Sequence, residues 1–349
     1  MHVVVPLIAA FFPTALYTLV LWWLDRYEKE PIHLLLVTFV WGAVPALALA
    51  VVAELALDGT ASTLLGPEAP ATVVAPVIEE TLKALVLIGL FIFARREFNG
   101  VLDGIIYGAL VGFGFAMSEN ILYFIAYRDQ LIGTWLLRSI VFGFNHAFYT
   151  SIVGIALGMV RYERRRWVGY VAVPIALWLA ILLHSLHNVW TQLGLVGYSL
   201  AWLVDSGGVL VVLATIVLSQ RQERTWISAE LSEEVQRGTI TPAQFDRALR
   251  PAMRSRVELQ ILLRRGWLQY RRMRRFHHLL TELAYVKHQL HRHDRFCRSD
   301  DVEDLRVAVL AIRRLVEDRP APASTANTAN EFAVDTMKPA KAGSEAHGR

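Results

Sequence analysis

Two adjacent glutamates and a lysine stand inside a long apolar segment. Glu79, Glu80 and Lys83 lie in the run 71–93, which is otherwise almost entirely apolar and long enough to span a bilayer. An ionised group at the bilayer centre costs about 2.5–3.5 kcal/mol on insertion scales. A structural ion pair with Lys83 explains one carboxylate. Because adjacent helical residues point about 100° apart, we expect one glutamate to face a site while Lys83 holds the other.

Three later apolar runs carry further polar residues of the same kinds. A lone histidine in such a run is often structural, bonded to a neighbouring carbonyl, but four helices with carboxylates or histidines ask for a common explanation. These residues are Glu119 and Asn120 in the run 101–127, His146 in 135–160, and His184, His187 and Asn188 in 168–191.

The residue types favour the activation of a water molecule. A buried glutamate can serve as a general base, with histidine and asparagine side chains stabilising the oxyanion. The same types can hold a metal ion that activates water. The chain contains no HExxH motif and no motif for a nucleophilic serine or cysteine. Both water-activating mechanisms therefore stay open.

The composition predicts the elements that position these residues. The chain has 349 residues, of which 54% are hydrophobic and 19% charged, and its mean hydropathy is +0.39. Almost all of the apolar share lies before residue 219. We therefore predict an all-α, polytopic membrane helix bundle of about seven transmembrane helices, at 3–24, 32–52, 71–93, 101–127, 135–160, 168–191 and 199–218.

Arginine and lysine alternate between the loops of this bundle. They gather in 25–31, 94–100 and 161–167, are absent from 53–70 and 192–198, and are reduced to Arg128 in the fourth loop. The positive-inside rule places the N-terminus outside and the C-terminus inside. With this orientation each of the four helices places polar residues about 7–11 residues from the outer surface, while His187 and Asn188 lie nearer to it. We expect them to meet at one depth.

The chain divides into three predicted regions. These are a transmembrane domain at 1–219, a helical, arginine-rich cytoplasmic region at 220–318 in which Thr241-Pro242 begins a helix, and a disordered tail at 319–349. The arginine cluster at 264–275 favours contact with anionic lipid or a cytoplasmic partner, and no nucleic acid is expected. The single cysteine, Cys297, excludes an intramolecular disulfide framework.

Small residues recur every four positions in the fourth predicted span. Gly104, Gly108, Gly112 and Ala116 form a row of the kind that lets helices approach closely in lipid. Glu119 lies on the same side of this helix, two turns beyond Gly112. The row therefore predicts that Glu119 faces protein.

The sequence resembles the PrsW family of intramembrane proteases, which is related to the CAAX-processing and bacteriocin-processing membrane proteases. The resemblance covers roughly residues 20–190. It rests on Asp25-Arg26-Tyr27-Glu28-Lys29-Glu30-Pro31, Glu79-Glu80-Thr81-Leu82-Lys83, Asp103-Gly104-Ile105-Ile106-Tyr107-Gly108, Gly112-Phe113-Gly114-Phe115-Ala116-Met117-Ser118-Glu119-Asn120, His146 and His184-Ser185-Leu186-His187-Asn188.

The resemblance implies hydrolysis of peptide bonds within or at the edge of the membrane. By similarity, Glu79 and Glu80 supply the base and Glu119, His146 and His184 complete the site. Asn188 matches an oxyanion-supporting position, while Lys83, Asn120 and His187 support the site, and His187 is an alternative to His184. The candidate ligands for a divalent metal such as zinc are Glu80, Glu119, His146 and His184. Adjacent glutamates make awkward joint ligands, so we favour the glutamate mechanism.

The function predicted on this basis is that of a membrane-embedded endopeptidase in the bacterial plasma membrane. Its substrates would be membrane-anchored proteins, cleaved in regulated proteolysis of membrane signalling proteins. Two alternatives come from other classes: a proton-coupled transporter that uses a Glu/His relay, and a haem-binding membrane protein. Inverted repeats, which usually accompany the first, are not evident in the sequence. A haem would leave the paired glutamates unexplained.

Overall fold

The computed structural model of the chain describes residues 3–27, 29–95, 97–163, 165–292 and 298–317. Within these ranges the ordered elements are helices and no strand occurs, which confirms the all-α prediction. The predicted disordered tail, 319–349, and Cys297 lie outside the described residues.

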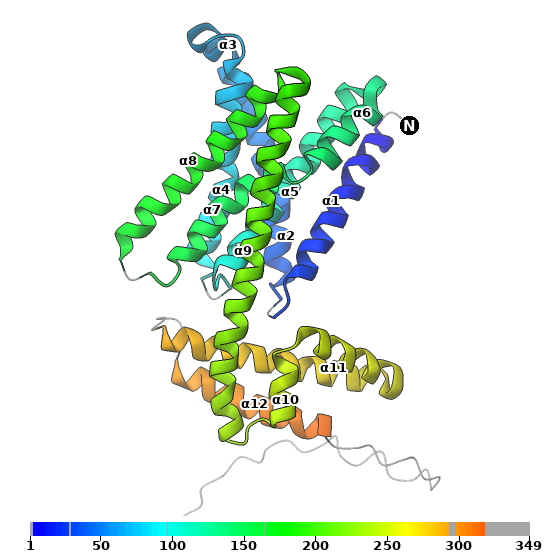
Figure 1. Cartoon of the computed structure of the whole chain (residues 1–349), viewed down its shortest axis with the longest axis vertical. Coiled ribbons are helices and arrows are strands. Elements are labelled where there is room, and N and C mark those ends of the chain that lie inside the picture. The colour runs from blue at the N-terminus through cyan, green and yellow to red at the C-terminus, as the bar shows by residue number, and fades with distance from the viewer. Residues whose placement is uncertain (1–2, 28, 96, 164, 293–297, 318–349) are drawn as a thin grey trace, which may run out of the picture.

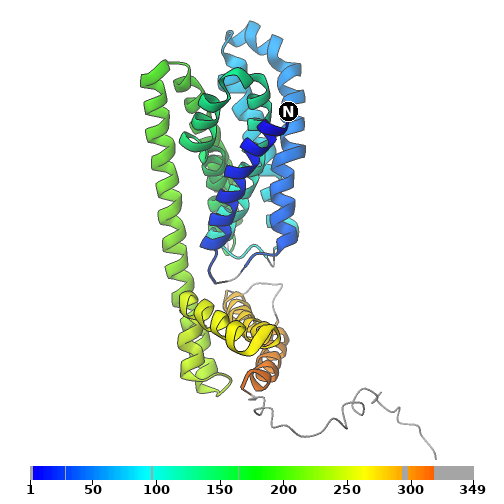
Figure 2. The same cartoon turned by 90° about the vertical axis from the view of Figure 1, so that its right-hand side faces the viewer.

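The membrane domain is a bundle of long helices that run in the same general direction (Figures 1 and 2). Its elements are α1 (Val4–Leu24), α2 (Ile32–Trp41), a π-helical segment (Gly42–Ala46), α3 (Leu47–Leu65), a π-helical segment (Pro70–Val74), α4 (Ala75–Phe93), α5 (Val101–Ala126), a 3₁₀ turn (Arg128–Gln130), α6 (Leu131–Trp135), a π-helical segment (Leu136–Val141), α7 (Asn145–Val160), α8 (Arg166–Thr191) and the first half of α9 (Gly194–Gln236).

Six helical segments in the described residues are long and apolar enough to cross a membrane. They correspond to every predicted span except 71–93. That span contains α4, which differs from the six segments in having three charged residues, Glu79, Glu80 and Lys83, within its apolar run. Helix α4 packs against α3, α7 and α8 inside the bundle. The protein is thus a multi-pass integral membrane protein that contains a helix with three charged residues.

The predicted loop 53–70 is mostly helical. Helix α3 continues to Leu65 and ends at Gly66, whose φ of 106° lies in the region that favours glycine. The sequence has no proline between Pro45 and Pro67, and the alanines of 56–61 support a helix that continues past the bilayer. The prediction of an irregular loop was therefore wrong for most of this segment.

The fifth predicted span, 135–160, is a broken helix. A π-helical segment ends at Val141, residues 142–144 are not helical, and α7 begins at Asn145. The carbonyl oxygen of Ser139, which a continuous helix would pair with the Gly143 amide, accepts a hydrogen bond from Tyr17 Oη at 2.6 Å. The break makes α7 begin at Asn145 and places His146 at its second residue.

The chain before the glutamate pair is also irregular. Because Pro76 has no N–H, the sequence predicts a kink or break near it. The structure places the π-helical segment Pro70–Val74 directly before α4, and the Ala75 amide bonds to the carbonyl of Pro70, five residues back. The helix is widened at this point but not broken.

The glycine row on α5 lies against α7, as predicted. A Cβ added at Gly104 would lie 2.0 Å from the carbonyl oxygen of Gly154, and one at Gly112 would lie 2.5 Å from that of His146. These contacts leave no room for any side chain. Helix α5 is therefore the central, buried helix and fixes the position of α7.

A second helical unit, the tail bundle, lies beyond one end of the membrane domain (Figure 1). It consists of the second half of α9 with α10 (Pro242–Ala248), α11 (Pro251–His291, bent at Gly266) and α12 (Ser299–Glu317). Thr241 caps α10 in a capping box, which confirms the predicted helix start. Helix α9 passes without interruption through 219–220, the predicted domain boundary.

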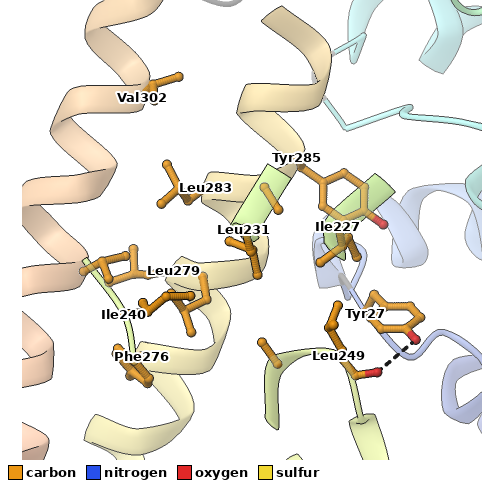
Figure 3. Close-up of a cluster of buried hydrophobic side chains, with 14 of the residues drawn as sticks. Tyr27, Ile227, Leu231, Ile240, Leu249, Phe276, Leu279, Leu283, Tyr285 and Val302 are labelled. Atoms are coloured by element: carbon orange, nitrogen blue, oxygen red, sulfur yellow. Dashed lines mark hydrogen bonds between the residues drawn. The ribbon is translucent and has the colours of Figure 1, made fainter. Parts of the chain in front are cut away.

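The tail bundle has its own hydrophobic core, to which a loop of the membrane domain contributes. Leu231, Leu280 and Leu283 are fully buried in it. Tyr27, from the loop after α1, is buried against this core, and its hydroxyl donates a hydrogen bond to the Leu249 carbonyl (Figure 3). The two units therefore share a packed contact.

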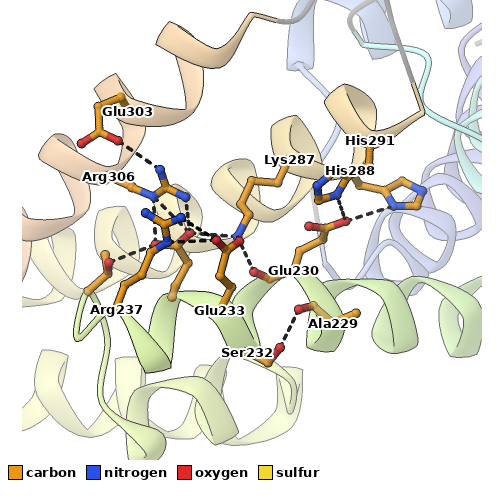
Figure 4. A network of polar contacts seen from close by, with 12 residues as sticks. Ala229, Glu230, Ser232, Glu233, Arg237, Lys287, His288, His291, Glu303 and Arg306 are labelled. Carbon is orange, nitrogen blue, oxygen red and sulfur yellow. Dashed lines mark hydrogen bonds and ion pairs between the residues drawn. The ribbon is translucent and has the colours of Figure 1, made fainter.

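Ion pairs join the helices of the tail bundle around α9. Lys287 of α11 contacts Glu233 at 2.7 Å and Glu234 at 2.8 Å. Arg306 of α12 approaches Glu234 at 2.8 Å, and His291 approaches Glu230 at 2.9 Å (Figure 4). Both α11 and α12 are thereby held to one stretch of α9.

Candidate active site

The glutamate pair is bound by one lysine ammonium. Lys83 Nζ lies 3.0 Å from Glu79 Oε2 and 2.9 Å from Glu80 Oε1. Lys83 follows Glu79 by four residues and Glu80 by three, so both carboxylates are on its side of α4. Its ammonium also lies 3.8 Å from the ring centre of Phe115. Lys83 is fully buried and holds both carboxylates, whereas the sequence predicted that it would hold one.

His146 links α4 to α5. Its Nδ1 lies 3.0 Å from Lys83 Nζ and its Nε2 lies 3.0 Å from Glu119 Oε2. An ammonium has only donors, so Nδ1 accepts and the ring hydrogen lies on Nε2, which faces the Glu119 carboxylate. Arg138 approaches the same oxygen, Glu119 Oε2, at 2.6 Å and donates to Asn120 Oδ1 at 2.7 Å. These residues form a continuous polar chain across four elements: α4, α7, α5 and the π-helical segment Leu136–Val141.

His184 completes the site from α8. Its Nδ1 lies 3.0 Å from Glu80 Oε1, and since that oxygen only accepts, Nδ1 carries the hydrogen. Its Nε2 then presents a lone pair and has no hydrogen-bond partner within the described residues. The ring of Tyr149 stacks on His184 at 5.2 Å between ring centres, with an angle of 20° between the planes.

A cavity of about 930 Å³ opens beside these groups. Its wall includes Glu79, Glu119, His146 and His184, but neither Glu80 nor Lys83. Further parts of its wall come from α3, α5, α8 and the segments before α4 and α7. Glu79 is thus the glutamate of the pair that faces the cavity, while Glu80 lies behind it.

The other predicted site residues lie at the edge of this cluster. Asn188 lines the cavity, but its Nδ2 donates to the Ala71 carbonyl at 2.8 Å. Asn120 is the acceptor for Arg138, away from Glu79 and Glu80. His187 also lines the cavity, and its Nδ1 lies 2.7 Å from Asp205 Oδ2 instead of contacting a glutamate. Of the two histidines on α8, the one bonded to the glutamate pair is His184.

Sequence reasoning missed four polar residues of the site. Arg138 and Asp205 were visible as charged residues inside predicted spans, which is the signal that identified the glutamates. Asn145 and Tyr149 flank His146 on α7 and carried no separate signal. Asn145 Oδ1 accepts from the His146 amide at 2.7 Å, and its Nδ2 has no hydrogen-bond partner in the described part of the chain.

Comparison with known protein families decides the classification. The family model described as "PrsW family intramembrane metalloprotease" matches residues 30–219, which is more than half of the chain and includes every site residue named above. The chain belongs to the PrsW family. It is a membrane-embedded endopeptidase, and the resemblance stated from the sequence is confirmed.

Individual relatives agree with this family assignment. The chain is 31% identical to Protease PrsW of Geobacillus kaustophilus over 173 residues, covering 48% of this chain and 70% of that protein. It is 30% identical to Protease PrsW of Bacillus subtilis over 151 residues, covering 41% of this chain and 65% of the relative. It is 37% identical to that of Halalkalibacterium halodurans over 122 residues, covering 31% and 53%. No solved structure matches the chain.

The family description implies a metal ion, and the buried donors fit one by type and spacing. Glu79, Glu80, His146 and His184 each offer a ligand atom, and these atoms lie within 4.8 Å of one another. Imidazole and carboxylate donors suit zinc, which when bound would make a water molecule more acidic. Lys83 Nζ contacts three of these four residues, so metal binding would require Lys83 to release them.

Proposed function

We propose that this PrsW-family protease cleaves membrane-anchored proteins with Glu79 as the general base. The observation that carries the proposal is the position of the Glu79 carboxylate, which lines the cavity while Lys83 holds one of its oxygens. Glu79 Oε1 has no partner within the described residues. Glu79 can therefore take a proton from a water molecule that attacks the scissile carbonyl.

Glu80 and Lys83 act by holding the reacting groups in place. Glu80 fixes the His184 ring through Nδ1, so that Nε2 is left to accept a hydrogen bond from the attacking water. The proton that Glu79 takes from this water then passes to the leaving amine. Lys83 contacts one oxygen of each carboxylate and so fixes the orientation of both. Neither residue lines the cavity, so both would act by positioning other groups and not by contacting the substrate.

Asn145 is the proposed oxyanion donor. It lines the cavity at the first turn of α7, where the helix break leaves the end of the helix open. Its Oδ1 is fixed by the His146 amide, so Nδ2 has a defined direction. A preorganised amide donor is of the kind that stabilises a tetrahedral intermediate. Asn188, the position matched from the sequence, is engaged with the Ala71 carbonyl.

The substrate is proposed to reach the site from the predicted outer side. The cavity opens at the end of the bundle away from the tail, and that end faces outside if the positive-inside orientation holds. A membrane-anchored protein could present an extended segment there. Cleavage at this position suits regulated proteolysis, because it would release a signalling protein from its outer domain.

The test is hydrolysis of fluorescein-labelled casein and of a single-span fusion protein by the purified enzyme in lipid nanodiscs. We expect Glu79→Gln to lower kcat by about 10²- to 10⁴-fold with little change in thermal stability. Glu68→Gln, a change to a carboxylate outside the site, is the matched control. A folded Glu79→Gln enzyme with wild-type kcat would remove Glu79 from the mechanism.

The tail bundle is proposed to rest on anionic lipid through the bend of α11. The exposed apolar residues Leu259, Leu263, Trp267 and Leu268 lie around Gly266. Six arginines lie between residues 264 and 275, and no acidic residue occurs between Glu258 and Glu282. An apolar tip surrounded by arginines is complementary to an anionic leaflet, where each basic residue contributes about 1 kcal/mol.

A spin label distinguishes lipid from a protein partner at this tip. On a Cys297→Ser background, a label at Leu263→Cys should become accessible to oxygen and protected from a polar nickel reagent in phosphatidylglycerol nanodiscs, but not in phosphatidylcholine nanodiscs. Val307→Cys, exposed on α12, is the control and should not change. Equal nickel accessibility at Leu263 in both lipids would exclude lipid as the partner.

A further inference from the structure

A buried aspartate on α9 stands outside the chemistry described so far. Asp205 lies in the apolar half of α9, and only 4% of it is exposed. A carboxylate at membrane depth is costly unless it is paired and hydrogen-bonded, and such residues are candidates for function. Asp205 does not line the cavity. Any role in hydrolysis must therefore act through neighbouring side chains.

Each oxygen of Asp205 has a separate partner from a different helix. Oδ1 accepts a hydrogen bond from the Tyr149 hydroxyl of α7 at 2.8 Å, and Oδ2 lies 2.7 Å from His187 Nδ1 of α8. Since a carboxylate only accepts, His187 donates through Nδ1. One carboxylate thus fixes two rings that belong to two other helices.

Both partners of Asp205 contact the catalytic region. The ring of Tyr149, which is fully buried, stacks on His184 and meets His146 edge-on with 6.3 Å between ring centres. His187 is one turn from His184 on α8 and lines the cavity. Without its hydroxyl contact, the Tyr149 ring would lose the polar anchor that sets its plane.

We propose that Asp205 is a positioning residue that fixes the ring of His184 through Tyr149 and the ring of His187 directly. The stacked Tyr149 ring limits rotation of His184, which keeps Nδ1–H on Glu80 and leaves Nε2 as the acceptor. The hydrogen bond from His187 Nδ1 likewise leaves Nε2 of His187 as an acceptor at the cavity wall. This proposal rests on the proposed role of His184 in hydrolysis.

The first experiment measures the rings directly. In protein labelled with nitrogen-15 at histidine, His184 should show the Nδ1–H tautomer in the wild type, with the signal assigned by its loss in His184→Gln. In Asp205→Asn and Tyr149→Phe we expect a mixture of the two tautomers. This readout needs no turnover, so it stands even if Glu79 proves not to be the base.

The second experiment measures catalysis with the casein assay. We expect Asp205→Asn and Tyr149→Phe each to lower kcat by about 10- to 100-fold, the usual range for groups that orient a reactive side chain, with KM unchanged. The double variant should have a kcat no lower than that of the less active single variant, because both substitutions act on the His184 ring. If Asp205→Asn fails to fold, Tyr149→Phe alone carries both measurements.

Thr215→Val is the matched control on α9. Its hydroxyl bonds only to the Val211 carbonyl of its own helix, so removal of this group should change neither kcat nor the histidine signals. The proposal is overturned if His184 keeps a single tautomer in folded Asp205→Asn, or if the effects of Asp205→Asn and Tyr149→Phe on kcat are fully additive. A rise in KM with unchanged kcat would also overturn it.

Discussion

At the scale of residues, Lys83 is the group on which the charged cluster depends. Its three hydrogens meet two carboxylates and the acceptor nitrogen of His146, so each donor has a partner. No single charge of this cluster would be tolerated alone at such burial. The cluster is stable only as a set.

Removal of the ammonium should therefore be costly. We expect Lys83→Met to lower the free energy of unfolding by about 3–5 kcal/mol, because it leaves two buried carboxylates without their cation. Thermal unfolding in detergent measures this. Arg128→Met, which removes an exposed ion pair with Asp129, is the control and should change stability by less than about 1 kcal/mol. Equal stability of the two variants would contradict the central role of Lys83.

Metal dependence separates the two water-activating mechanisms. Because Lys83 already contacts three of the four candidate ligands, we expect the purified active enzyme to contain less than one equivalent of zinc by elemental analysis. Its rate of casein hydrolysis should survive dialysis against a chelator. Loss of activity on chelation that zinc restores would establish the metal mechanism instead and would show that Lys83 moves.

At the scale of elements, the contact between α5 and α7 sets the geometry of the site. Glu119 is on α5 and His146 is on α7, and the glycine row brings the two backbones together. The break before Asn145 then frees the first turn of α7. A continuous helix with larger residues at this contact would separate the two side chains.

A methyl group at Gly112 should displace α7. We expect Gly112→Ala to lower the free energy of unfolding by about 1–3 kcal/mol and to reduce kcat, because the added Cβ meets the carbonyl of His146 at 2.5 Å. Gly89→Ala on α4 is the matched control, since its Cβ would meet nothing within 4 Å. Thermal unfolding and the casein assay measure both effects. Similar results for the two variants would contradict the close-packing argument.

At the scale of the whole molecule, α9 connects the site with the tail bundle. The same helix carries Asp205 near one end and Glu233 and Glu234 near the other. The tail bundle also touches the membrane domain at Tyr27, and Arg254 donates to the Arg26 carbonyl at 2.8 Å. The bundle is therefore attached to the membrane domain by non-covalent contacts as well as by the continuous helix α9.

The ion pairs of the tail bundle predict its dependence on pH. Hydrogen bonds from Lys287 and Arg237 lower the pKa of Glu233 to about 2. Burial by itself raises the pKa of Glu234, but hydrogen bonds from Arg306 and Lys287 outweigh it and the net pKa is lowered. A lowered folded-state pKa gives stability that is present above the unfolded value, about 4.5, and is lost as pH falls through the folded value.

We therefore expect the tail bundle to lose stability progressively as the pH falls below about 4.5. Electron–electron resonance distances between labels at Gln222→Cys on α9 and Val307→Cys on α12, on a Cys297→Ser background, should broaden as pH falls from 7 to 3. Glu234→Gln should show a broadened distribution already at pH 7. A distribution that stays narrow at pH 3 would show that the hydrophobic core alone holds α12.

The amino-acid sequence determined the class of the protein and indicated most residues of the candidate site. Charged residues in apolar runs identified Glu79, Glu80, Lys83, Glu119, His146 and His184, because burial in lipid makes such residues too costly without a purpose. The alternation of arginine-rich loops predicted one common depth for them. The glycine row predicted the face on which Glu119 lies. These are local patterns, which a sequence displays directly.

Only the tertiary structure decided which partner each group has. That Glu79 faces the cavity and Glu80 lies behind it depends on the rotation of α4 against α5, α7 and α8. The break before Asn145 depends on Tyr17, far away in sequence, which takes the Ser139 carbonyl from its own helix. The link from Asp205 through Tyr149 to His184 joins three helices. Such contacts between distant segments leave no periodic signal in the sequence, so packing alone determines them.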